Sequence, residues 1–286
     1  MKNLNFYRNY NKYMNGVSVV IFTKNSYSDL KELLFQINTE NFNELIISDE
    51  NSNDDTLKLA KKFTRKIIKS KYLLGKKRLL EAFKKCDYKF VICIETDHRI
   101  KKKGVFNELR KSLVNSNIYF AYAKLEYYKP NNFFSKAMAD HYSMLSYKNY
   151  IGAPYITYTD FIKDIYNMRY ISEGAGNDSA LIDIFLKKKI KTKVIKEKLF
   201  QKENLNFNSF FKKFYWYGKG DYSFYFNNHK IWNFKRKIKS LTHVASNYFF
   251  IFPLLSLRQK KFNYILFLFL AGLIRYAGFM SKFLFK

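Results

Sequence analysis

The chain has little cysteine, proline or glycine: its 286 residues include 2 Cys, 3 Pro and 10 Gly. Two cysteines are too few for a disulfide framework, so Cys86 and Cys93 are expected to be buried, reduced thiols in a cytosolic compartment. No Gly/Ser-rich stretch marks a linker, no internal repeat is found, and no Cys/His cluster has zinc-binding spacing. The sequence therefore excludes disulfide-stapled, repeat and zinc-finger architectures.

The N-terminus, from Met1 to Tyr7, lacks the apolar core of a secretory signal, so no cleaved leader is expected. Elsewhere apolar residues are plentiful, at 48% of the chain with 20% aromatic, which excludes disorder. The length allows one large domain, or a domain with an appendage.

Acidic residues are scarce towards the C-terminus. The formal net charge is +29, and the last hundred residues, Lys187 to Lys286, carry 22 Lys and Arg against 3 acids, a local balance of +19. A basic surface attracts nucleic acid, anionic lipid or phosphorylated substrates. A compositional explanation stays open, because Lys, Asn, Ile, Phe and Tyr are abundant together, as an AT-rich genome would produce.

The first half of the chain alternates strands and helices. Two helices are expected to begin with capping boxes, Ser26 with Asp29 and Ser52 with Asp55. This order predicts an α/β fold, an open and largely parallel sheet with helices on both faces. The expected strands are residues 17–22, 45–47, 67–68, 90–94 and 118–122.

Polar residues follow three of these strands: Thr23-Lys24-Asn25, Asp49-Glu50 and Glu95-Thr96-Asp97. In open α/β sheets, ligands bind outside the carboxyl ends of the strands. If the three strands are neighbours, their polar ends converge on one crevice. The sequence therefore predicts a binding site there.

The third strand end carries two carboxylates, Glu95 and Asp97, on the same side of an extended segment. Oxygen-only ligands suit Mg²⁺ or Mn²⁺, which would share a substrate diphosphate. His98 follows directly, and three readings of it stay open: a metal ligand, a donor to phosphate, or a surface histidine.

The segment from Val17 to Phe63 resembles the opening of family 2 glycosyltransferases with the GT-A fold. That opening has an apolar strand ending in Thr-x-Asn, a helix, and a strand ending in Asp-Asp-Gly-Ser-x-Asp-Asp-Thr. Asp49 to Thr56 matches the last motif, with Glu50 for the second Asp and Asn51 for the Gly. Glu95-Thr96-Asp97 takes the place of the family's Asp-x-Asp, and the resemblance continues to about Gly220.

The resemblance implies a GT-A-type open mixed, largely parallel sheet flanked by helices, with residues 14–222 as the catalytic domain. It also implies roles for five residues at the strand ends. Thr23 would line the nucleotide pocket, and Asp49 and Glu50 would hold the base. Glu95 would bind the ribose and the metal–diphosphate, with Asp97 as the main metal ligand.

Three further segments have two readings each. Asp178 matches the catalytic base of the family's Glu-Asp motif, with Asn177 in place of the Glu, but a carboxylate there is also a good helix cap. Arg78 is expected either near the diphosphate or on a solvated basic helix face. Phe214 to Gly220 resembles the aromatic-basic segment that closes over acceptor and diphosphate in several members, or it packs in a core.

The C-terminal residues 223–286 are expected to form a basic, apolar helical segment associated with a membrane. Its two apolar runs, Val244 to Leu257 and Phe262 to Ile274, are each shorter than the roughly 20 residues of a spanning helix. An embedded hairpin or helices lying in the interface are therefore expected, the alternative being a buried core helix.

Together these observations predict an inverting glycosyltransferase at the cytoplasmic face of the cell membrane. The expected partners are a UDP- or GDP-linked sugar donor, a glycan or lipid-linked acceptor, Mg²⁺ or Mn²⁺ and an anionic membrane surface, with no nucleic acid. A polyprenyl-phosphate glycosyltransferase is the alternative within this class. A basic membrane- or nucleic-acid-binding protein with a degenerate sugar-nucleotide fold is the alternative outside it, but that reading leaves the acids at the strand ends unexplained.

Overall fold

The computed structural model describes residues 16–72, 75–114, 117–144, 155–168, 177–202 and 205–284. The chain divides into two compact units, which we call the sheet unit (residues 1–125, 151–171 and 181–201) and the helical unit (residues 126–150, 172–180 and 202–286). The domain boundary expected between residues 222 and 223 lies inside a continuous helix, α8 (Phe207–Asn228). The second unit is therefore larger than the C-terminal segment alone.

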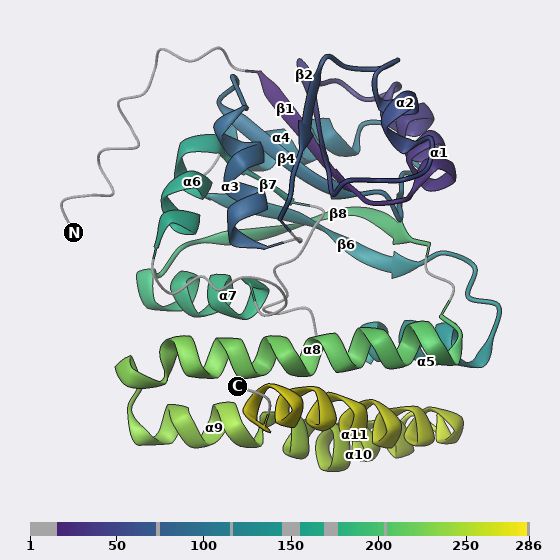
Figure 1. The fold of residues 1–286 in the computed structure, drawn as a ribbon, viewed down its shortest axis with the longest axis vertical. Coiled ribbons are helices and arrows are strands. Elements are labelled where there is room, and N and C mark those ends of the chain that lie inside the picture. Colours follow the sequence, from purple (N-terminus) through teal and green to yellow (C-terminus); the bar gives the residue numbers. More distant parts are fainter. Residues whose placement is uncertain are drawn as a thin grey trace. The chain divides into compact units, whose positions relative to one another are not determined.

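The sheet unit is built on an eight-stranded mixed sheet with the order β3-β2-β1-β4-β7-β6-β8-β5 (Figure 1). Its first four strands are parallel, and β4–β7, β7–β6 and β8–β5 pair antiparallel. The expected open mixed sheet is confirmed, although β5, β7 and β8 had no counterpart in the sequence pattern. The strands are β1 (Val17–Thr23), β2 (Glu44–Asp49), β3 (Lys66–Lys69), β4 (Phe90–Glu95), β5 (His98–Arg99), β6 (Phe120–Tyr127), β7 (Tyr155–Tyr158) and β8 (Thr192–Gln201).

Helices connect these strands and supply much of the core. Every residue of β1 and β2 is buried, which explains why their centres, Val19 to Phe22 and Leu45 to Ile47, are apolar without alternation. Helix α1 buries Leu30, Leu33, Leu34 and Ile37, one face at the i, i+3, i+4, i+7 spacing. The described helices that join these strands are α1 (Tyr27–Ile37), α2 (Thr56–Ala60), α3 (Lys76–Lys84), α4 (Val105–Val114), α6 (Thr159–Asn167) and α7 (Asn177–Lys188).

Both expected capping boxes are wrong. The hydroxyl of Ser26 donates to the backbone carbonyl of Lys24, and α2 begins at Thr56, too late for Ser52 to cap it. Asp54 is used instead: its carboxylate accepts from the backbone N–H groups of Tyr27 and Thr56, the first residues of α1 and α2. One carboxylate therefore binds the starts of two helices that lie far apart in the sequence.

The helical unit packs an aromatic core. Phe210, Phe214, Tyr248 and Phe267 are buried there, so the core-packing reading of the segment around Phe214 is confirmed for this side chain. The elements are α5 (Phe133–Met144), α8, a 3₁₀ turn η3 (His229–Ile231), α9 (Phe234–Ala245), a π turn η4 (Ser246–Ile251), α10 (Phe252–Arg258) and α11 (Phe262–Leu284).

Helices α8 and α11 pack against each other at two glycines. A Cβ on Gly218 would collide with the backbone carbonyl of Arg275, and one on Gly278 would collide with that of Tyr215. Beside this contact, Arg275 donates two hydrogen bonds to Asp221, at 2.5 and 2.7 Å. Burial opposes ionisation of Asp221, but Arg275 overcomes it and lowers the pKa of this carboxyl to about 2. The two helices are thus held by close backbone contact and an ion pair.

We expect Gly218→Ala to destabilise the helical unit. Alanine gains about 1 kcal/mol in helix propensity, but overpacking against backbone atoms costs about 1–3 kcal/mol, and a backbone carbonyl cannot rotate away. Urea unfolding monitored by near-UV circular dichroism measures the change. Lys212→Ala, at an exposed position of the same helix, is the control and should stabilise slightly or not at all. A G218A protein more stable than the wild type would contradict this packing.

His141 makes the stability of the helical unit depend on pH. It lies buried on α5, where its Nδ1 contacts the hydroxyl of Tyr264. Burial, with a smaller contribution from Arg275, lowers the pKa of His141 to about 3. Below the unfolded value of about 6.5, the unfolded chain binds a proton that the folded chain does not, so stability is lost as the pH falls.

We expect the free energy of unfolding to drop by about 2 kcal/mol from this group between pH 6.5 and pH 5. In His141→Gln that part of the slope should vanish, even though the variant is less stable at pH 7. His229→Gln, at a half-buried position on η3, should keep the wild-type slope. Equal slopes in H141Q and wild type would show that His141 is not buried in its neutral form.

Candidate functional site

The three polar strand ends meet as expected. In the sheet register, Thr23 at the end of β1 lies opposite Asp49 at the end of β2. On the other side of β1, Phe22 lies opposite Glu95, the last residue of β4. The carboxyl ends of β2, β1 and β4 are therefore neighbours, which confirms the expected adjacency of the three strands. That their polar ends form a binding site stays a prediction.

The loops after β1 and β2 bind each other. The side-chain oxygen of Asn25 accepts from the backbone N–H of Asn53 at 2.8 Å, and the backbone N–H of Asn25 donates to the Ser52 hydroxyl at 2.8 Å. Asn25 and Asn51 both have positive φ, 45° and 49°. Asparagine is one of the few residues other than glycine that visits this region readily, which is why Asn51 can stand where the family motif has Gly.

Asp49 is buried and holds this loop. Its side chain is 0% exposed, and its two oxygens accept from the Ser52 backbone N–H at 2.8 Å and the Ser52 hydroxyl at 2.5 Å. In this conformation both carboxylate oxygens are engaged inside the loop. Glu50 is the accessible member of the pair, with 11% of its side chain exposed.

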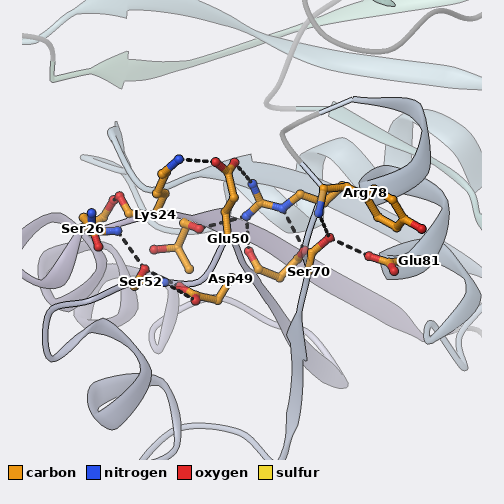
Figure 2. A network of polar contacts seen from close by, with 12 residues as sticks. Lys24, Ser26, Asp49, Glu50, Ser52, Ser70, Arg78 and Glu81 are labelled. Atoms are coloured by element: carbon orange, nitrogen blue, oxygen red, sulfur yellow. Dashed lines mark hydrogen bonds and ion pairs between the residues drawn. The ribbon is translucent and has the colours of Figure 1, made fainter.

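Glu50 lies between two cations, Lys24 and Arg78 (Figure 2). Arg78 is only 2% exposed, and one of its terminal nitrogens donates to Glu50 at 2.8 Å. Its other guanidinium nitrogens donate to the Ser48 hydroxyl at 3.1 Å and to the Thr23 carbonyl at 2.9 Å. Arg78 thus ties the ends of β1 and β2 together beneath the Glu50 carboxylate.

The solvated-face reading of Arg78 is therefore wrong. Burial lowers the pKa of Arg78, while Glu50 and Asp49 favour its charged form. A guanidinium keeps its proton in proteins, so the buried charge persists at neutral pH. The hydrogen bonds to its carboxylate and carbonyl partners offset the free-energy cost of burying this charge.

A candidate metal site lies at the end of β4. Glu95, Asp97 and His98 offer ligand atoms that lie within 4.8 Å of one another. Asp97 Oδ2 accepts from the Gln201 side chain at 2.8 Å, whereas Oδ1 is buried and has no hydrogen-bond partner among the described residues. A buried, unpartnered carboxylate oxygen beside a second carboxylate fits a hard divalent cation.

His98 is buried, so the surface-histidine reading is wrong. Its Nδ1 accepts from the Glu95 backbone N–H at 3.0 Å, which assigns the proton of the neutral ring to Nε2. Burial lowers the pKa of His98 and keeps the ring neutral. Nε2 lies 3.9 Å from Asp97 Oδ1, too far for a hydrogen bond. In this tautomer Nε2 is a donor rather than a metal ligand.

Gln201 was missed by the sequence analysis. It ends β8, which pairs with β5 so that Gln201 lies opposite His98. Only this long-range pairing brings its amide to Asp97, and no local pattern marks it.

Thr23 is 3% exposed, and its hydroxyl has no partner within the described part of the chain.

The expected catalytic base cannot be placed as a side chain. Asp178 is the second residue of α7, but its side chain, like residues 174–176 before it, lies outside the described residues. Its role as base or as helix cap stays a prediction.

We expect Arg78→Met to disorder the polar loops at the ends of β1 and β2. Removing one partner of a buried ion pair costs about 3–5 kcal/mol, since Glu50 and two backbone carbonyls lose their donor. Thermal unfolding measures the loss of stability. Lys84→Met, at an exposed position of the same helix, should leave the stability unchanged. Wild-type stability in R78M would contradict the structural role.

Comparison with solved structures gives similar folds at low sequence identity. Glucosyl-3-phosphoglycerate synthase from Mycobacterium tuberculosis with Mn²⁺, UDP and phosphoglyceric acid matches with a TM-score of 0.53 and 15% identity, covering 74% of this chain and 78% of that chain. The same enzyme with Mg²⁺ and UDP gives 0.52 and 14%, covering 74% and 79%. Residues 1–349 of TarS from S. aureus give 0.51 and 17%, covering 82% and 74%.

The family assignment comes from the sequence itself. The comparison with curated proteins gives no match. The model of glycosyl transferase family 2 matches residues 18–173, more than half of the chain, and this range includes the strand ends described above. The chain therefore belongs to glycosyl transferase family 2, has a GT-A-like fold and is a glycosyltransferase.

Proposed function

We propose that this enzyme moves a sugar from a nucleotide-diphosphate donor to an acceptor hydroxyl, with inversion at the anomeric carbon. The observation that carries the proposal is the buried Oδ1 of Asp97, which has no hydrogen-bond partner among the described residues. It lies at a strand end two strands away from the accessible carboxylate of Glu50. A nucleoside diphosphate would reach from Glu50, which would bind its base, to Asp97, which would hold a divalent cation on its diphosphate.

Glu50 is the group that we assign to the base. Its carboxylate forms ion pairs with Lys24 and Arg78, and a carboxylate only accepts hydrogen bonds. It would accept the imide N–H of uracil or the N1–H of guanine, consistent with a UDP- or GDP-linked donor. Asp49 supports it by holding the loop. The hydroxyl of Thr23, which has no partner in the described ranges of the chain, would line the nucleotide pocket. Arg78 then acts through Glu50 rather than on the diphosphate.

Asp97, with Glu95, would hold Mg²⁺ or Mn²⁺. The solved glucosyl-3-phosphoglycerate synthase structures contain Mn²⁺ or Mg²⁺ together with UDP, which supports a divalent cation here. When bound, such a cation neutralises charge on the departing nucleoside diphosphate. Gln201 fixes the Asp97 carboxylate through Oδ2 and leaves Oδ1 for the cation. The Nε2–H of His98 is the donor that remains for a phosphate oxygen.

Asp178 is the base in this proposal. At the start of α7 its carboxylate would take the proton of the acceptor hydroxyl as the oxygen attacks the anomeric carbon. The single displacement breaks the bond from the sugar to the diphosphate on the opposite face, which inverts the configuration. Asn177 beside it supplies no second acid.

For the acceptor, we propose a glycan or lipid-linked molecule at the cytoplasmic face of the cell membrane. The basic balance of the C-terminal hundred residues favours a polyanionic surface, and no Asp or Glu follows Asp221. The same charge supports a second candidate within this class, transfer to a polyprenyl phosphate.

The test is release of UDP or GDP from a panel of nucleotide sugars by the purified full chain with Mn²⁺. We expect turnover with one donor, loss of turnover with EDTA, and a fall of about 10²-fold or more in Asp97→Asn and Asp178→Asn. Glu108→Gln, an exposed carboxylate on α4, is the matched control and should keep wild-type activity.

Wild-type turnover in either Asp variant would remove that residue from the mechanism. Product stereochemistry, read by NMR with a simple acceptor, tests the inversion. No release from any donor, together with nucleic-acid binding that weakens with salt, would instead favour the basic binding protein.

A further inference from the structure

Several helices of the helical unit expose large apolar side chains. Each of three consecutive helical stretches places large side chains in solvent at a spacing of three, four or seven residues, so each forms a stripe on one side of its helix. We call the sum of these stripes the apolar face. Its residues are Phe234, Ile238 and Leu241 on α9; Phe250, Leu254 and Leu257 on η4 and α10; and Phe262, Leu266, Phe269, Leu273, Met280 and Phe283 on α11.

These stripes are not the sides that form the core. On α11 Phe267, Ala271 and Ile274 are among the buried residues, whereas Leu266 and Leu273 are 60% and 59% exposed. Figure 1 shows α9, α10 and α11 on the same side of α8. Large apolar patches of this kind mark interaction sites on proteins rather than ordinary surface.

We propose that the apolar face docks onto an anionic lipid bilayer, with α9, α10 and α11 lying in the interfacial layer rather than crossing it. This docking rests on the membrane location proposed above for the transferase. Binding to vesicles can be measured without sugar transfer.

The charge around the apolar face favours an anionic bilayer as its partner. Exposed basic side chains lie on or beside the same helices, and no acid follows Asp221. An apolar stripe flanked by Lys and Arg is the pattern of helices that lie on anionic membranes. A second copy of the chain would instead bring like charges together. The exposed basic residues are Lys230, Lys235, Lys239, Arg258, Lys260 and Lys282.

The packing of α11 favours a position in the membrane interface over one that spans the bilayer. By length and composition, the stretch Tyr264–Leu284 of α11 could cross a membrane, and 39% of its apolar window is buried inside the protein. Gly218 and Gly278 fix α11 against α8, and Arg275 is paired with Asp221. Crossing would carry this ion pair into the hydrocarbon layer, which is costly. Lying in the interface immerses only the exposed stripe.

The test is flotation of the purified full chain with vesicles of phosphatidylcholine alone, or with phosphatidylglycerol added. We expect binding to the anionic vesicles that weakens with added NaCl, and weaker binding to the neutral ones. The triple variant Leu254→Gln, Leu266→Gln, Leu273→Gln should bind the anionic vesicles about tenfold less or weaker still, because three immersed side chains are lost. Alkaline carbonate should release the bound wild type.

The matched control replaces three exposed apolar residues of the sheet unit, Phe35→Gln, Val114→Gln and Leu186→Gln, and should bind like the wild type. Circular dichroism and donor hydrolysis without lipid check that both triples are folded. Failure of donor hydrolysis in the wild type would refute the transferase proposal and leave the vesicle result standing.

Equal vesicle binding by the L254Q/L266Q/L273Q protein and the wild type would overturn the inference, as would resistance of the wild type to carbonate. The inference would also be overturned if the wild type did not bind vesicles but was a dimer in light scattering and the triple variant was a monomer. That result would assign the apolar face to contact with a second copy of the chain.

Discussion

The buried guanidinium of Arg78 is the interaction on which the candidate site depends. A charge that is 2% exposed must be fully bonded, and its partners come from the ends of two strands, β1 and β2, and from Glu50. Fixing these partners fixes the accessible carboxylate at the edge of the sheet. Asp49 does the same for the loop that follows, through Ser52. Of the pair Asp49-Glu50, Asp49 is therefore internal structure, and Glu50 is the accessible carboxylate.

The part of this arrangement that the sequence predicts is the part set by strands. Val17 to Phe22 and Phe90 to Ile94 are apolar because parallel strands in the middle of a sheet are buried on both faces, and parallel strands end at the same edge. Placing Thr23, Asp49 and Glu95 together needed no knowledge of the register. The glycosyl transferase family 2 match covers the same segment.

What the sequence could not give depends on contacts between distant segments. Ser52 has the spacing of a capping box, yet Asp49 binds its hydroxyl, and Asp54 serves both helices instead. Gln201 reaches Asp97 only because β8 pairs with β5, across 104 positions. A local pattern does not show which of several polar groups a side chain will bind, because that depends on where distant loops meet in the fold.

The C-terminal helices show the same limit for apolar residues. Hydropathy counts Phe267 and Leu266 alike, but one is buried against α8 and the other is exposed. Helix α11 needs two apolar sides because it packs on α8 through Gly278 and also presents a stripe outward. A helix with apolar residues all round passes a composition test for a spanning segment. The pairing of Arg275 with Asp221 argues otherwise, because an ion pair fixed inside a packed helical unit is stable where water is near and costly in the middle of a bilayer.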